Sequence, residues 1–225
     1  MEAHGVSKGL FRVPECLFRF DPAVDSGADS TAEAMGAKSL RDLVKKDFYR
    51  VRKDRAANVL WIVAEMLRNP GFRAVLYFRL TNWLLRKRVP ILPTLLQAHA
   101  LRSTGADLSC GARIGGGLLL PHPVGVVVGG GAVIGENRTI LQGVTVGERL
   151  GIDRKHEYPK IGSCVTLCAG AVCLGAINIG DGSVVGANAV VLTDVPACSV
   201  VAGVPARVVG RATDKQESRL LASEQ

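Results

Sequence analysis

An aliphatic residue returns every six positions through much of the second half of this chain, and this period constrains the fold more than any other feature. The marked residues are aliphatic or Cys throughout: Leu108, Ile114, Leu120, Val128, Ile134, Ile140, Val146, Ile161, Leu167, Cys173, Ile179, Val185 and Val191. Six is an even number, so each marked side chain points to the same face of a strand, whereas a helix needs a period near 3.6. Short fixed periods with Gly-rich corners are typical of a hexapeptide parallel β-helix. We therefore predict a mainly β protein, a left-handed parallel β-helix preceded by a small α-helical segment.

The period of six is interrupted twice. Leu120 and Val128 are eight residues apart, which predicts a bulge at a corner in residues 121–125. Val146 and Ile161 are fifteen residues apart, so residues 148–159 should form a loop that leaves the coil. Long loops within strict repeats usually carry binding or catalysis.

Aromatic residues divide the chain into parts. Tyr158 is the only aromatic residue after Leu101. A narrow coil has room for Val, Ile, Leu and Ala but not for Trp, so this change in composition marks a boundary. We expect a flexible N-terminal tail (1–36), a basic α-helical segment (37–104), the β-helix (105–212) and a C-terminal tail (213–225). Within the second part, residue patterns predict helices over about 40–53, 56–67, 72–86 and 94–102, with Ser39 as a cap. The apolar stripe expected on the third of these helices consists of Phe72, Leu76, Leu80, Trp83 and Leu84.

Positive charge is concentrated in the helical segment. Residues 38–88 carry fourteen Lys and Arg against four Asp and Glu, whereas the whole chain has a net charge of +8. A solvated helix face is the commonest meaning of such a segment, and contact with an anionic membrane surface is a lesser alternative. No nucleic-acid partner is expected, because the chain lacks a recognition-helix, zinc-finger or aromatic RNA-binding pattern.

The cysteines show no CxxC pair and no metal-ligand spacing, and we interpret them as small hydrophobic residues in a reducing compartment. No continuous apolar core of a signal peptide is found in residues 1–20, so we expect a cytoplasmic protein. No metal is expected, since His122 and His156 are the only histidines in the repeat region.

His122 is the leading candidate for chemistry. It stands in the irregular corner between Pro121 and Pro123, which restrict its backbone. Asp107 comes fifteen residues earlier, nearly one coil, so the two should lie at the same edge, about one strand spacing apart. A carboxylate there can accept a hydrogen bond from one imidazole nitrogen and leave the other as a base. The alternative is that Asp107 caps the first turn and His122 is a surface residue.

Several stretches of the chain resemble the serine acetyltransferase family of acetyl-CoA-dependent, hexapeptide-repeat O-acetyltransferases. The resemblance covers roughly residues 70–210 and is carried by residues 106–108, 113–115, 120–125, 140–147 and 203–207, with the helical stretches 71–74 and 79–84. It implies an acyltransferase in which His122 is the general base and Asp107 its carboxylate partner. The acceptor hydroxyl would attack the acetyl thioester directly, without a covalent enzyme intermediate.

The resemblance also implies where the substrates bind. Acetyl-CoA, the co-substrate, would lie along the edge of the coil between two subunits of a homotrimer, with a hexamer left open. The matching cofactor-binding positions are Gly147, Ala169, Ala187 and Arg207, the last meeting the phosphates. The matching substrate-binding positions are Arg154, His156 and Gln142.

Departures from the family pattern leave the acceptor open. Pro121 stands where the family usually has an acidic residue, and Asn69-Pro70 is the nearest match to an Asp-Pro pair ahead of the helix. Arg154 and His156 match an Arg-His pair only with a short insertion. The acceptor is serine or a serine-like small molecule, or alternatively a sugar, polysaccharide precursor or natural-product hydroxyl. A second alternative is a non-catalytic scaffold that keeps the repeat and has lost the acceptor pocket.

Overall fold

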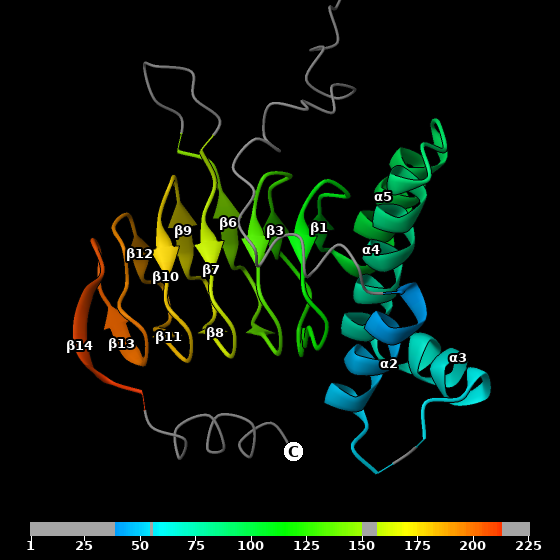
Figure 1. The fold of residues 1–225 in the computed structure, drawn as a ribbon, viewed down its shortest axis with the longest axis horizontal. Coiled ribbons are helices and arrows are strands. Elements are labelled where there is room, and N and C mark those ends of the chain that lie inside the picture. The colour runs from blue at the N-terminus through cyan, green and yellow to red at the C-terminus, as the bar shows by residue number, and fades with distance from the viewer. Residues whose placement is uncertain (1–38, 55, 150–156, 213–225) are drawn as a thin grey trace, which may run out of the picture.

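Helices precede a stack of short strands along the chain (Figure 1). The computed structural model describes residues 39–54, 56–149 and 157–212, so the two predicted tails lie outside the described residues. The helices are α2 (Leu40–Val51), α3 (Val59–Arg68), α4 (Pro70–Arg86) and α5 (Leu92–Thr104). Ser39 caps α2 as predicted, its side chain accepting from the Asp42 N–H. The second helix begins three residues later than predicted, because the Asn58 side chain caps it by accepting from the Trp61 N–H.

The strands follow one another around three sheets. The first sheet contains β1 (Asp107–Leu108), β3 (Val127–Val128), β6 (Thr145–Gly147), β9 (Val172–Leu174) and β12 (Val190–Val191). The second contains β2 (Arg113–Ile114), β4 (Val133–Ile134), β7 (Lys160–Ile161) and β10 (Asn178–Ile179). The third contains β5 (Thr139–Ile140), β8 (Thr166–Leu167), β11 (Val184–Val185), β13 (Ser199–Ala202) and β14 (Arg207–Arg211). The chain visits the sheets in turn, so it winds as a three-sided coil of parallel strands. Among the described strands, only β14 pairs antiparallel, with β13.

Register confirms both predicted interruptions of the repeat. Thr145 in the first sheet pairs with Val127, eighteen residues earlier, which is one regular coil. Asp107 pairs with Val127 across twenty residues, so the first coil holds the predicted two-residue bulge. Thr145 pairs with Val172 across twenty-seven residues, and the additional nine belong to the predicted loop after β6.

All of the residues marked by the six-residue period are buried inside the coil. Residues of the same type stack on successive coils, as the second sheet shows with Ile114, Ile134, Ile161 and Ile179. Burying an aliphatic side chain of this size contributes about 1.5–3 kcal/mol each. The repeat therefore holds the coil together by a continuous apolar column.

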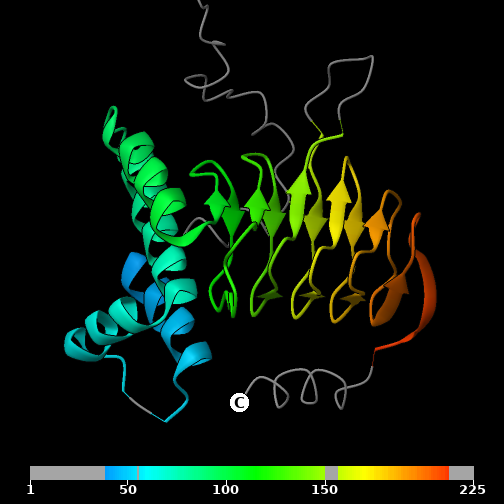
Figure 2. The same ribbon diagram turned by 180° about the vertical axis from the view of Figure 1, so that it is seen from behind.

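The helices pack against the N-terminal end of the coil (Figure 2). Gly71 at the start of α4 lies so close to the Leu120 carbonyl that any side chain there would collide with it. α5 ends at Thr104 and is capped by Gly105, whose φ of +74° is the left-handed conformation that glycine adopts easily, and the chain then enters β1. Ala74, Val75 and Phe78 of α4 belong to the same buried apolar cluster as the first coil.

A buried ion pair joins the helices to the coil. The Arg79 guanidinium of α4 donates to both carboxylate oxygens of Asp47 in α2, at 2.8 and 3.1 Å. Arg79 also donates to the carbonyls of Ile114 and Gly115 at 2.5 and 2.6 Å. The Asp47 carboxylate accepts from the N–H groups of Gly117 and Leu118 at 2.7 and 2.9 Å. The first coil has no preceding coil to pair with its backbone. Arg79 and Asp47 supply the hydrogen-bond partners that such a coil would otherwise provide.

The predicted apolar stripe of the third helix is partly wrong. Leu80 and Trp83 were expected on the packed face, but they are 38% and 40% exposed, whereas Arg79 and Thr81 are buried. The reason is that α4 packs against the polar end of the coil, which needs hydrogen-bond donors. No helix within residues 39–54, 56–149 and 157–212 is both long and apolar enough to cross a membrane.

The interpretation of the cysteines as small hydrophobic residues holds for Cys173, which is buried, and burial raises the pKa of its thiol to about 12. It is wrong for Cys164 and Cys198, which are exposed. Both lie at corners with positive φ, of 57° and 53°, where the side chain points away from the coil interior. Among the described cysteines, all thiols are free.

Arg138 is a buried cation in the coil. It is 1% exposed, and its Nε and Nη1 have no hydrogen-bond partner. Desolvation lowers the pKa of its guanidinium to about 10. Its neighbours in the adjacent coils are Leu118 and Val165, both apolar and buried.

We expect Arg138→Met to stabilise the fold, since it removes a buried charge that has few partners while keeping much of the side-chain volume. The expected gain is about 1–4 kcal/mol, read as a higher denaturant midpoint with an unchanged slope. Val165→Ala is the matched control and should lower the midpoint, because it opens a cavity in the neighbouring coil. A lower midpoint for Arg138→Met would contradict the expectation.

Candidate functional site

His122 lies in the bulged corner between Leu120 and β3. Pro123 holds the corner in place, since its side chain is buried and its carbonyl accepts from the Val126 N–H at 3.1 Å. The imidazole is exposed and makes no hydrogen bond to any described residue. Both ring nitrogens are therefore available to a ligand.

The structure brings this corner onto the stretch that contains Asp107. The Gly125 N–H donates to the Gly105 carbonyl, and the Asp107 N–H donates to the Val126 carbonyl, each at 2.8 Å. The Val124 side chain packs directly on Gly105. The backbone around His122 thus runs one strand spacing from residues 105–107, at the same edge of the coil.

The Asp107 carboxylate is half-buried, and its side-chain partner is Gln97 of α5. The Gln97 Nε2 donates to Asp107 Oδ1 at 2.9 Å. Among the described residues, no hydrogen bond joins Asp107 directly to His122. Catalytic contacts are often long without substrate and tighten when it binds.

Three other candidate residues form a column on the same edge. The Gly143 N–H donates to the Val124 carbonyl, the Gly170 N–H to the Gln142 carbonyl and the Asn188 N–H to the Ala169 carbonyl. Gln142, Ala169 and Ala187 consequently follow one another on successive coils, in line with the His122 corner. The small side chains at the last two positions leave backbone groups accessible beside this edge.

The remaining candidates lie elsewhere. Gly147 is at the opposite end of β6 from this column, against the Leu174 side chain. Arg207 begins β14, and its guanidinium donates to the Ala206 carbonyl at 2.9 Å. Arg154 and His156 lie outside the described residues.

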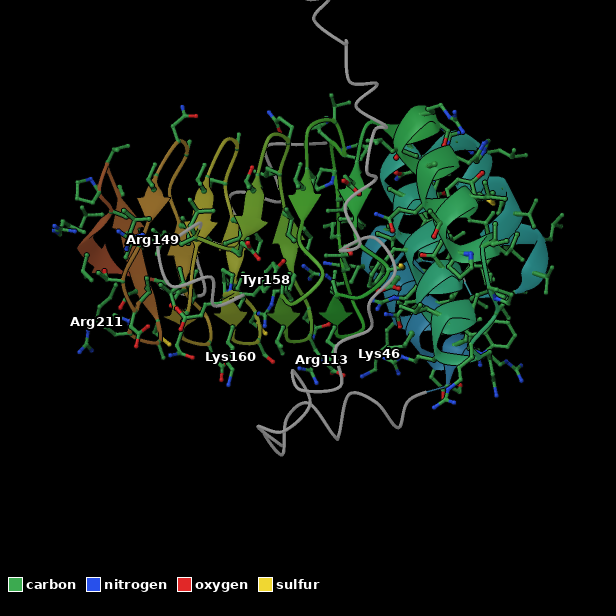
Figure 3. All side chains as sticks on the ribbon, turned by 90° about the horizontal axis from the view of Figure 1, so that it is seen from above. Lys46, Arg113, Arg149, Tyr158, Lys160 and Arg211 are labelled. Atoms are coloured by element: carbon green, nitrogen blue, oxygen red, sulfur yellow. The ribbon has the colours of Figure 1, made fainter. Side chains whose placement is uncertain are left out.

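Two residues near the loop and the helices were missed by sequence reasoning. Tyr158 packs its ring over Gly129 and Gly131, and burial followed by a hydrogen bond with Glu148 raises the pKa of its phenol. Glu148 follows β6 and Tyr158 precedes β7, and Figure 3 shows Tyr158 on the coil. Gln97 was missed because its role depends on how α5 meets β1, which no local pattern encodes.

The arrangement offers an exposed imidazole, a carboxylate whose position is fixed by an amide, and a column of small residues along one edge. An imidazole can accept a proton from a hydroxyl, and a nearby carboxylate can stabilise the cation that results. The column can accommodate an extended, narrow ligand. These are the elements of proton-assisted group transfer to an alcohol.

Sequence comparisons identify one group of relatives. A serine acetyltransferase of Helicobacter pylori is 39% identical over 159 residues, which cover 71% of this chain and 91% of that protein. A serine acetyltransferase of Synechococcus elongatus is 40% identical over 142 residues, covering 63% of this chain and 58% of the relative. Serine acetyltransferase 2 of Arabidopsis thaliana is 37% identical over 186 residues, covering 83% of this chain and 57% of the relative. The chain thus spans less than two thirds of the last two proteins, and no protein-family model matches it.

The solved structures that this chain resembles in fold are also serine acetyltransferases. A serine acetyltransferase of Brucella abortus in complex with coenzyme A superposes with a TM-score of 0.69 at 33% identity, covering 82% of this chain and 74% of that one. Soybean serine acetyltransferase complexed with serine gives 0.68 at 38% identity, covering 79% and 72%. A Brucella melitensis serine O-acetyltransferase described as a bacterial transferase hexapeptide repeat gives 0.67 at 34% identity, covering 82% and 72%.

Proposed function

Because the chain belongs to the serine acetyltransferase family, we propose that it transfers the acetyl group of acetyl-CoA to the hydroxyl of serine or of a serine-like small molecule. The observation that carries the proposal is the common edge of the coil: the His122 corner stacks on Gly105, two residues before Asp107. Two relatives that resemble this chain in fold were solved with coenzyme A and with serine. Their ligands support the donor and the acceptor named here.

In the proposed mechanism, His122 accepts the proton of the acceptor hydroxyl while the oxygen attacks the thioester carbonyl. Asp107 stabilises the imidazolium that forms. Collapse of the tetrahedral intermediate breaks the carbon–sulfur bond, and the imidazolium returns its proton to the departing thiolate. The products are the acetyl ester and free coenzyme A, and His122 is again neutral.

The proposal includes the architecture that the site needs. We assign the three-sided coil as a left-handed parallel β-helix of hexapeptide type, supported by the period of six and by the hexapeptide-repeat relative. Acetyl-CoA lies along the edge formed by Gln142, Ala169 and Ala187, between two protomers of a homotrimer. In this proposal Gly147 and Arg207 contact other parts of the donor, and Arg154 and His156 bind the acceptor.

The test is a thiol-release assay with acetyl-CoA and a panel of acceptors. We expect release with L-serine or homoserine that depends on both substrates, and mass spectrometry should find the O-acetyl product. Release with simple sugars instead would identify the alternative class of acceptor. Absence of release with every acceptor would refute the enzymatic function and favour a scaffold.

A further inference from the structure

Among the residues that the structure describes, the side chain that connects the helical segment to Asp107 is Gln97. It lies on α5, ten residues before Asp107, and its Nε2 donates to Asp107 Oδ1 at 2.9 Å. Its Oε1 accepts the backbone N–H of Cys110 at 3.2 Å. One amide therefore spans the strand β1 and the turn that follows it.

The two contacts fix which way the amide points. A backbone N–H can only donate, so the Gln97 oxygen must face Cys110 and the NH₂ group must face Asp107. An ionised carboxylate accepts hydrogen bonds and cannot donate them, so the contact with Asp107 requires the same orientation as the contact with Cys110. The two contacts together therefore hold the amide in a single orientation, with its NH₂ group on Asp107 Oδ1.

The turn itself is held from a second helix. Asn82 of α4 donates through Nδ2 to the carbonyls of Cys110 and Ala112, at 2.9 and 3.0 Å. The Cys110 peptide is thus bound on its N–H side by α5 and on its carbonyl side by α4. This makes the turn a rigid support for Gln97, and through it for the carboxylate.

We propose that Gln97 is a positioning residue for acetyl transfer: it holds Asp107 Oδ1 so that Oδ2 is directed to the imidazole of His122. This inference rests on the proposed function of His122 and Asp107. It also gives the helical segment a role in the site, since α5 supplies the amide and α4 steadies the turn. A carboxylate left free to rotate would be misplaced during proton transfer, and misplacement by about 1 Å costs up to about 100-fold in rate.

The test compares Gln97→Met, Gln97→Glu and His99→Ala with the wild type. Methionine keeps the length and removes both hydrogen bonds, whereas glutamate keeps the acceptor for Cys110 and replaces the donor by a repelling carboxylate. His99 lies on the same helix and contacts Tyr77, with 3.1 Å between His99 Nε2 and the Tyr77 hydroxyl, so it controls for loss of a side-chain contact from α5.

We expect kcat for thiol release to fall about tenfold in Gln97→Met and at least as much in Gln97→Glu, with the KM for acetyl-CoA within twofold of wild type. His99→Ala should keep kcat. A purely structural role of Gln97 would lower the melting temperature of both Gln97 variants and leave the kcat of the folded enzyme unchanged, which would overturn the inference.

A crystal structure of Gln97→Met tests the inference independently of activity. We expect the Asp107 side chain to leave its rotamer or to become disordered while β1 stays in place. An unchanged Asp107 rotamer would refute the positioning role even if the wild type proved inactive. A wild type without thiol release, combined with a displaced Asp107, would instead refute the proposed function alone.

Discussion

Replacing His122 by alanine should lower turnover by about 100- to 10,000-fold, the range over which a general base contributes to proton transfer. The imidazole is the group proposed to take the hydroxyl proton, and no other described side chain on this corner can replace it. The measurement is the rate of thiol release with saturating acetyl-CoA and the best acceptor. Turnover equal to that of the wild type would remove His122 from the mechanism.

The same substitution should leave the fold intact. His122 is exposed and makes no hydrogen bond to the described residues, so its removal is expected to change stability by no more than about 0.5 kcal/mol. A melting temperature near that of the wild type would therefore assign the lost activity to chemistry. His99→Ala again serves as the control, because it removes a histidine far along the chain from the bulged corner.

Replacing Arg79 by methionine should destabilise the protein by about 3–5 kcal/mol. The side chains of Arg79 and Asp47 are 3% and 0% exposed, so the substitution leaves a buried carboxylate without its cation. It also removes the donors to the Ile114 and Gly115 carbonyls at the end of the coil. Denaturant or thermal unfolding measures the effect, which corresponds to a fall in melting temperature of roughly 10 °C.

The matched control is Lys46→Ala, one residue from Asp47 on α2. Lys46 also reaches the coil through an ion pair, with Glu136 at 3.0 Å, but its side chain is 43% exposed. Exposed pairs contribute less than about 1 kcal/mol, so this variant should unfold close to the wild type. Similar losses for the two variants would show that burial does not set the strength of the helix–coil contacts.

The repeat allowed the coil to be predicted from sequence in detail. A period of six sets which side chain points inward whatever lies around the coil, so the core and both interruptions were predicted correctly. Helix positions were predicted to within a few residues, because helix caps such as Ser39 and breaks such as Asn69-Pro70 also act locally. His122 and Asp107 could be placed on one edge by counting residues per coil.

Other features required the contacts between distant segments. Leu80 and Trp83 look like packed residues on a helical wheel, yet α4 buries Arg79 instead, since the first turn of the coil presents carbonyls that have no strand below them. Cys164 and Cys198 are exposed because corner geometry, and not hydrophobicity, sets their direction. The local sequence pattern therefore predicts neither the packed face of α4 nor the direction of these two cysteine side chains.

The sequence by itself thus determined the repeating coil, its interruptions and the common edge of His122 and Asp107, because these follow from short-range periodicity. Only the tertiary structure decided how the helices close the end of the coil and how Gln97 comes to hold Asp107. Those contacts join residues on separate elements, and their geometry is set by the packing of α4 and α5 against the first coil, which no local pattern specifies.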